Sequence, residues 1–96
     1  MQPVSGYSYN HLVGTVAGTT VVSNHDGVLQ GVYFGTATTG TTTFYDVATA
    51  AGTTSTNKLF TVVNAVASSN NDIHTSVKKG IVAVVGGTVD MLVTYL

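Results

Sequence analysis

Strand-forming residues dominate this 96-residue chain, and strong helix formers are scarce. Valine and threonine together supply about a third of the residues, whereas glutamate and arginine are absent. Valine and threonine suit the pleated, half-buried surface of a sheet, while the few Leu and Lys residues are the types that favour helices. The composition therefore predicts an all-β fold.

Short runs of alternating apolar and polar residues, bounded by Gly, Asn, Asp and Ser, follow one another along the chain, which is typical of strands and turns. The runs cover residues 12–17, 19–23, 28–34, 41–47, 58–67, 73–77, 81–85 and 88–95. Seven or eight short strands without helices are typical of a β-sandwich or a small barrel, and of these we expect an antiparallel β-sandwich. Its strand order can be that of a jelly roll or that of an immunoglobulin-like domain, because both orders give the same alternation.

The run 28–34 is expected in the centre of a sheet, because it has apolar groups on both faces. One face is formed by Val28, Gln30, Val32 and Phe34, and the other by Leu29, Gly31 and Tyr33. The run 73–77 is expected at a sheet edge. The small and polar residues 48–57 and 68–72 predict a surface loop and a turn.

The last twenty residues contain two apolar runs, 81–85 and 88–95, on either side of Gly86-Gly87. A two-residue glycine connection can adopt the primed turns that hairpins prefer. These residues therefore predict a C-terminal β-hairpin.

Residues 1–11 fit the core pattern poorly, because small and polar side chains alternate with two tyrosines. We expect an extended N-terminal arm over residues 1–11 and a single β-sandwich domain over residues 12–96. Tyr7, Tyr9 and His11 are the residues of the arm that we expect to contact a partner subunit. Buried aromatic side chains are frequent anchors in such contacts.

No arrangement of residues predicts catalysis, a cofactor site or a metal site. The histidines His11, His25 and His74 have no metal-ligating spacing, and no serine lies in a nucleophile elbow. The four carboxylates, Asp26, Asp46, Asp72 and Asp90, are separated in sequence. We expect Asp26 and Asp72, in turn clusters, and Asp46, at a strand end, to bond nearby backbone amides. Tyr33, Tyr45 and Tyr95 are expected in the core. The chain is therefore not expected to be an enzyme.

Only seven residues carry a full charge, three lysines and four aspartates, whereas about a quarter of the residues in an ordinary domain are charged. Three lysines are too few to neutralise a nucleic-acid backbone, and no apolar run is long enough to span a bilayer. Residues 1–11 lack the features of a signal peptide, so we expect use without export. Charges on edge strands normally prevent sheets from pairing with one another, and their scarcity predicts that neighbouring protein covers this surface.

Three segments resemble the small structural proteins of tailed bacteriophages: residues 20–34, 41–53 and 77–96. In that family, a turn leads into a "GVL" strand, a "YD" strand precedes an Ala/Gly/Thr loop, and the last strand closes with "V-x-Y". The matching residues here are Gly27-Val28-Leu29, Tyr45-Asp46 and Val93-Thr94-Tyr95. The resemblance implies a virion β-sandwich that acts as a symmetric oligomer, often a trimer, and it carries over no catalytic residue.

The expected function is that of a capsid decoration (cement) protein, which is made in the host cytoplasm and binds the major capsid protein on the virion surface. A head-fibre or tail-tip module that binds host glycan is the alternative. A cupin-like enzyme would need a cluster of His and Glu ligands, and the chain has no Glu.

Overall fold

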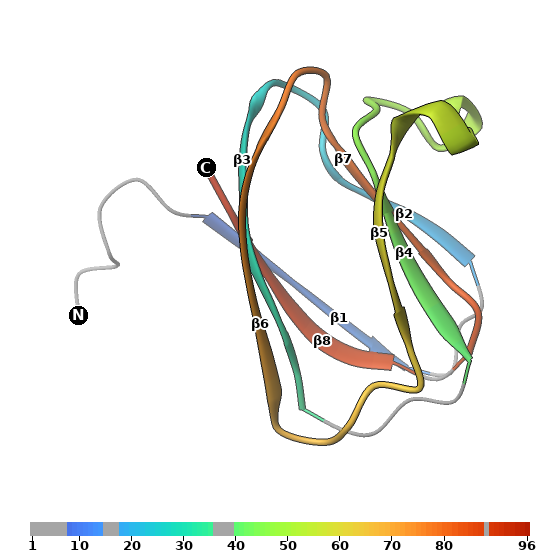
Figure 1. The fold of residues 1–96 in the computed structure, drawn as a ribbon, viewed down its shortest axis with the longest axis vertical. Helices are drawn as coiled ribbons and strands as arrows, with labels where there is room; N and C mark the ends of the chain where they lie inside the picture. Colours follow the sequence, from blue (N-terminus) through green and yellow to red (C-terminus); the bar gives the residue numbers. More distant parts are fainter. Residues whose placement is uncertain (1–7, 15–17, 36–39, 88) are drawn as a thin grey trace.

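The computed structural model describes residues 8–14, 18–35, 40–87 and 89–96, with the backbone alone for residues 8–14. These residues form a sandwich of two antiparallel four-stranded sheets, which Figure 1 shows facing each other. The prediction of an all-β sandwich is confirmed.

The first sheet, sheet A, has the strand order β1-β8-β3-β6, and the second, sheet B, has the order β2-β7-β4-β5. Sheet A consists of β1 (Ser8–Gly14), β8 (Val89–Tyr95), β3 (Gly27–Phe34) and β6 (Ser69–Val77). Sheet B consists of β2 (Gly18–Ser23), β7 (Ile81–Val85), β4 (Thr41–Tyr45) and β5 (Lys58–Val63). Two short 3-10 helices, η1 (Ala50–Gly52) and η2 (Ser55–Asn57), lie between β4 and β5.

The strands pair in a nested series. The first described strand pairs with the last, β2 with β7, β3 with β6, and β4 with β5, each time antiparallel. The contacts of β3 with β8 and of β4 with β7 then join these pairs into two sheets. A ladder of nested pairs that is rolled up in this way is a jelly roll, so the structure distinguishes between the two predicted strand orders.

The prediction of a C-terminal β-hairpin is wrong. β7 pairs with β2 and β4 in sheet B, whereas β8 pairs with β1 and β3 in sheet A. The segment around Gly86 therefore crosses from one sheet to the other, and the Gly86 amide donates a hydrogen bond to the Thr41 carbonyl, 2.8 Å away. Alternation shows which face of a strand is apolar, but it does not show which strand lies beside it, and a Gly-Gly connection fits both a hairpin and an arch.

A bulge in β3 changes the faces predicted for that strand. The register with both neighbouring strands shifts between Leu29 and Gly31. Leu29 therefore joins Val32 and Phe34 in the core, all three without exposed surface, while Tyr33 points outward and is 41% exposed. The central position predicted for this strand is confirmed, but the placement of Leu29 opposite Phe34 and of Tyr33 in the core is wrong.

Strand ends differ from the sequence pattern in three places. β1 begins at Ser8, so the described part of the segment predicted as an arm lies in sheet A, paired with β8. β6 begins at Ser69 and includes most of the predicted turn 68–72, although it lies at the sheet edge as predicted. β5 ends at Val63, where Asn64 takes a positive φ of 49°.

The core fills the space between the two sheets. Its largest fully buried apolar side chains are Phe34, Phe44, Leu29, Ile81, Met91, Val32 and Val93. The Phe44 ring stacks on Phe60, with 4.8 Å between the ring centroids and 16° between the planes. Phe60 is only half-buried, at the β5 edge of sheet B. Phe44 therefore contributes more buried apolar surface than its stacking partner.

We expect Phe44→Ala to lower the free energy of unfolding by about 3–5 kcal/mol, because the substitution leaves a cavity in a closely packed core. Phe60→Ala should cost clearly less, since this ring already contacts solvent. Urea denaturation of both variants, with Phe44→Leu as a milder substitution that keeps the protein folded, measures the difference. Equal losses at the two positions would contradict this account of the core.

Candidate functional site

All three lysines of the chain, Lys58, Lys78 and Lys79, lie around one hollow at one end of the sandwich, which we call the lysine end. Lys58 begins β5, and the other two form the turn between β6 and β7. Figure 1 shows that this turn and the β4–β5 loop project from the same end of the molecule. The hollow has a volume of about 360 Å³ and is also lined by Asp46, Thr56, Asn57 and Leu59. The positive side chains of the protein are therefore gathered in one place.

Asp46 holds the two lysine-bearing segments together. Its carboxylate accepts hydrogen bonds from the backbone amides of Lys78 at 3.0 Å and Lys79 at 2.9 Å, and more weakly from Gly80 at 3.4 Å. Its own amide donates to the Asn57 carbonyl at 2.8 Å, one residue before Lys58. This one residue therefore fixes the β6–β7 turn against the β4–β5 loop.

Close backbone approach also fixes the turn. A Cβ atom at Gly80 would lie 2.5 Å from the Ser23 carbonyl oxygen and 2.7 Å from that of Val47. In the β4–β5 loop, the Asn57 side chain accepts from the Thr54 amide at 2.9 Å and donates to the Gly52 carbonyl at 2.8 Å. Both backbone segments that carry the lysines are thus well supported, while the lysine side chains are exposed.

Burial raises the pKa of Asp46, but its three backbone hydrogen bonds and the nearby Lys79 charge lower it by more, so the pKa lies below its ordinary value of 3.8. A carboxylate that is bonded in this way stabilises the fold while it is ionised. The stabilisation is therefore present above the unfolded-state pKa and is lost as the pH falls through the folded-state value.

The outer face of sheet B carries little charge. Strand pairing shows that its outward positions with exposed surface are Thr19, Val21, Val84, Thr41, Thr43, Tyr45, Thr61 and Val63, with Lys58 at one end. Val82 lies on the same side of β7 but has no exposed surface. The prediction that Tyr45 lies in the core is therefore wrong, since it lies on the side of β4 opposite Phe44. Val63 is 64% exposed and Val21 40% exposed. The hydroxyls of Thr43 and Thr61 are 3.1 Å apart across β4 and β5. We call this surface the Thr/Val face.

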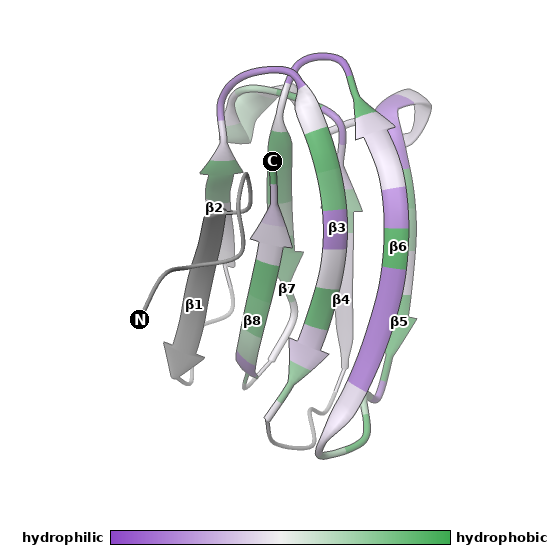
Figure 2. Ribbon diagram, turned by 90° about the vertical axis from the view of Figure 1, so that its left-hand side faces the viewer, coloured by the Kyte–Doolittle hydropathy of each residue, from purple (hydrophilic) through white to green (hydrophobic). Residues whose placement is uncertain are grey.

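The outer face of sheet A is more polar. Along β6 the exposed side chains are Asn70, Asp72, His74 and Ser76, and Figure 2 shows β6 as mainly hydrophilic. The Gln30 side chain links two neighbouring strands, since its amide nitrogen is 3.5 Å from His74 Nε2 and its oxygen accepts from the Thr94 hydroxyl. These side chains protect the β6 edge from pairing with another sheet.

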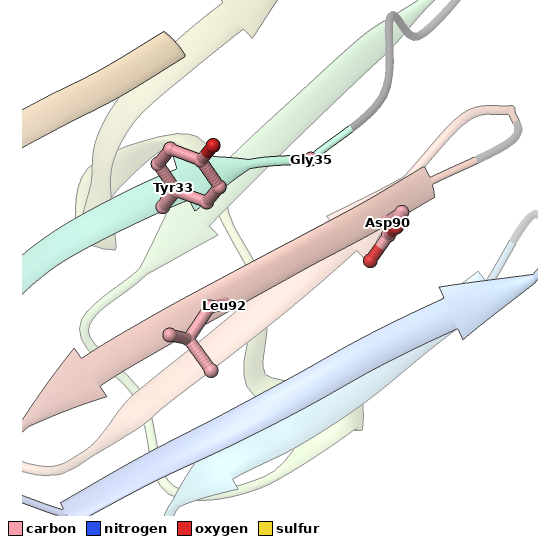
Figure 3. A pocket seen from close by; sticks show the side chains of 4 residues that line it. All are labelled: Tyr33, Gly35, Asp90 and Leu92. Carbon is pink, nitrogen blue, oxygen red and sulfur yellow. The ribbon is translucent and has the colours of Figure 1, made fainter. Parts of the chain in front are cut away.

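One hollow interrupts the polar face of sheet A (Figure 3). It has a volume of about 360 Å³, and its described lining is Tyr33, Gly35, Asp90 and Leu92. Figure 3 shows the Tyr33 and Leu92 side chains projecting from neighbouring strands, with the Asp90 carboxylate farther along β8. A Cβ at Gly35 would lie 3.0 Å from Asp90 Oδ2, so a glycine here leaves room for the carboxylate. We call this site the Tyr33 hollow.

The residues predicted to contact a partner are only partly described. Tyr7 lies outside the described residues. Tyr9 and His11 belong to β1, where their backbones pair with Thr94 and Leu92. The prediction that these three residues bind a partner stays a prediction, but two of them lie in a sheet edge.

The remaining titratable residues form no metal site within the described part of the chain, where no three His, Cys, Asp or Glu side chains come together. His25 lies in the β2–β3 turn, with its Nδ1 2.8 Å from the Asp26 carbonyl oxygen, and His74 lies on β6. Nor do the described residues include a helix with the length and apolar character needed to cross a bilayer.

Sequence reasoning missed both hollows. It identified Asp46 as a carboxylate that bonds backbone amides, but it did not show that these amides lie more than thirty residues away at 78–80. The one usable signal was that the chain has only three lysines among its 96 residues. If the fold brings so few cations together, they form a single positive site. The alternation of apolar and polar residues gives no sign of the bulge in β3. It therefore did not reveal that Tyr33 points outward, into a hollow.

We expect Asp46→Asn to lower the free energy of unfolding by about 1–3 kcal/mol at pH 7, because an amide is a weaker acceptor for the three backbone N–H groups than a carboxylate. The difference from the wild type should shrink as the pH falls below the ordinary value of 3.8, and it should be lost once the pH has fallen through the lower folded-state pKa of Asp46. Urea denaturation at neutral and acidic pH measures both effects. A stability difference that persists unchanged at acidic pH would contradict the role given to the charge.

A scan of protein-family models found no significant match to this chain, and searches of curated proteins and of solved structures found none either. The fold therefore rests on the strand pairing described above.

Proposed function

We propose that this chain is a non-enzymatic structural protein of a bacteriophage virion, which binds and stabilises the capsid shell as a decoration protein. The observation that carries the proposal is the Thr/Val face, a whole sheet surface that is charged only at its Lys58 end. Its partner would be the major capsid protein, and the chain would act there as a homo-oligomer, with a trimer favoured.

The Thr/Val face has the composition of a contact surface. The centre of a protein interface is depleted of charged side chains relative to the rest of the surface. Valine side chains offer apolar area, and rows of threonine hydroxyls offer hydrogen bonds without the cost of desolvating a charge. Exposed Val21 and Val63 on opposite edge strands extend this surface across the whole sheet.

The edges of sheet B support the same proposal. β2 and β5 are edge strands, and Lys58 is the only charged residue in either of them. Natural proteins usually protect such edges with charge, proline or a covering segment. An edge without this protection is suited to pairing with a neighbouring protein.

The jelly-roll fold is compatible with this function but does not establish it. Jelly rolls occur in viral capsid proteins and also in lectins and cupins, and one fold supports many functions. A protein that binds only the assembled shell stabilises it by mass action, by RT ln(1 + [L]/Kd) for each site, where [L] is the free concentration of the protein. No reactive group is needed for such an effect.

We expect Thr19→Lys combined with Thr61→Lys to lower the occupancy of the chain on purified particles at least about tenfold, because two charges on the Thr/Val face would have to be desolvated in the contact. Quantitative mass spectrometry of virions, as the ratio of this chain to the major shell protein, measures occupancy. Asn70→Lys combined with Ser76→Lys is the control, since it adds the same charge to exposed positions of sheet A. Absence of the wild-type chain from virions, or equal losses in both variants, would contradict the proposal.

A second candidate function is supported by the Tyr33 hollow. An exposed tyrosine ring beside a carboxylate and an apolar side chain offers a sugar both a stacking surface and a hydrogen-bond acceptor. Tyr33, Leu92 and Asp90 provide these groups on two neighbouring strands. This arrangement favours a head-fibre or tail-tip module that binds host glycan.

If the chain binds glycan at this hollow, Tyr33→Ala should reduce binding on a glycan array to background, because the stacking surface is removed. Asn70→Ala, on the neighbouring strand β6, should keep the wild-type signal. A wild-type protein without any array signal would argue against the second function and would leave the capsid proposal unaffected.

A further inference from the structure

We infer that the lysine end is a docking site for an acidic polypeptide segment, whose side-chain carboxylates would contact Lys58, Lys78 and Lys79. This inference does not depend on the identity of the partner as a capsid protein, and it concerns a surface other than the Thr/Val face. It would give the protein a second, electrostatic contact with a defined direction.

The cationic side chains are distributed unevenly over the molecule. Every cationic side chain of the chain lies at this hollow, although the net charge of the protein is −1. Lys58 and the pair Lys78-Lys79 are twenty residues apart in sequence, so the fold brings them together. Three like charges at one place repel one another and cost stability. A counter-charge supplied by a partner would remove this cost.

Hydrogen bonds of Asp46 hold the backbone of the site in position. Asp46 bonds the backbone amides of residues 78–80 and, through its own amide, the carbonyl of Asn57. Its carboxylate is therefore engaged mainly with the backbone of the turn. The ammonium groups extend from two segments whose backbones are fixed relative to each other. A site arranged before binding loses less conformational entropy when a ligand binds.

The lining of the hollow indicates the class of ligand. The hollow combines lysine side chains with the apolar Leu59 and the hydroxyl of Thr56, which suits a peptide with both carboxylates and aliphatic groups. A nucleic acid would require more cations along its backbone and is usually read by arginine, which this chain lacks. A polypeptide with several carboxylates can offer one to each lysine, whereas a single phosphate ion brings at most about two negative charges at neutral pH.

The test is a titration of the ¹⁵N-labelled full chain with poly-L-glutamate, followed by NMR. We expect amide shifts confined to residues 56–59 and 78–80. The apparent Kd should rise about tenfold or more between about 20 mM and about 200 mM salt, because exposed charge pairs are screened. Absence of shifts at these residues would overturn the inference.

Matched variants separate the effect of the three lysines on binding from the effect of the net charge of the protein. Lys58→Gln, Lys78→Gln and Lys79→Gln in one protein should weaken binding at least about tenfold, and the corresponding triple arginine variant should keep it, since its charge is unchanged. Val66→Asp, Ser68→Asp and Asn70→Asp in one protein make the same change in net charge at exposed positions around the β5–β6 connection, at the opposite end of the sandwich (Figure 1). This variant should stay within about threefold of the wild type. Equal weakening of the two sets would show that net charge alone controls binding and would overturn the inference.

Inorganic phosphate distinguishes the source of the negative charge. We expect it to cause only weak shifts at the same amides, since one phosphate ion brings fewer negative charges to the three lysines than a segment with several carboxylates. If phosphate binds at these residues as tightly as poly-L-glutamate, the site is one for small oxyanions, and the assignment to a polypeptide is wrong. None of these outcomes depends on whether the chain is found on virions, so failure of the capsid proposal and failure of this inference are distinguishable.

Discussion

The nested pairing of strands, first with last and so on inward, is the constraint from which the surfaces of this protein follow. It places β8 and β7 inside the two sheets and sends almost every connection across the sandwich, except that between β4 and β5. Alternate connections therefore reach the same end of the molecule (Figure 1). The β4–β5 loop and the β6–β7 turn meet in this way, and their meeting gathers the lysines. The hollow with three cations is thus a product of topology and not of any local motif.

Two surfaces of different chemistry result from this arrangement. The Thr/Val face is broad and almost uncharged, and the lysine end is small and positive. The first suits a contact of large area, in which exclusion of water contributes most of the affinity. The second suits orientation and encounter, since charge acts over a longer range than packing. A protein that carries both can bind a large partner in one defined orientation.

The sequence predicted where the strands lie better than it predicted which strands pair with one another. Apolar runs bounded by turn residues located β3, β7 and β8 almost to the residue. In β7 and β8 the inward side chains are apolar in every second position. This pattern did not reveal that Gly86 lies in an arch between sheets, since pairing depends on contacts between residues far apart in the chain. It also failed at Gln30, where one extra residue in the strand reverses the faces on its two sides. The lysine end and the Tyr33 hollow depend on these long-range features, so neither could be derived from local patterns.

The position of β8 between β1 and β3 has a consequence for how the protein is made. Sheet A cannot close until residues 89–95 have left the ribosome, because the strand that joins its two halves is the last one translated. Folds dominated by pairings between distant residues also form slowly. The nascent chain would therefore emerge with β1 and one edge of β3 unpaired until β8 follows, in a state prone to aggregation. Rapid completion of synthesis, or protection by a chaperone, would then matter more for this chain than for a helical protein of the same size.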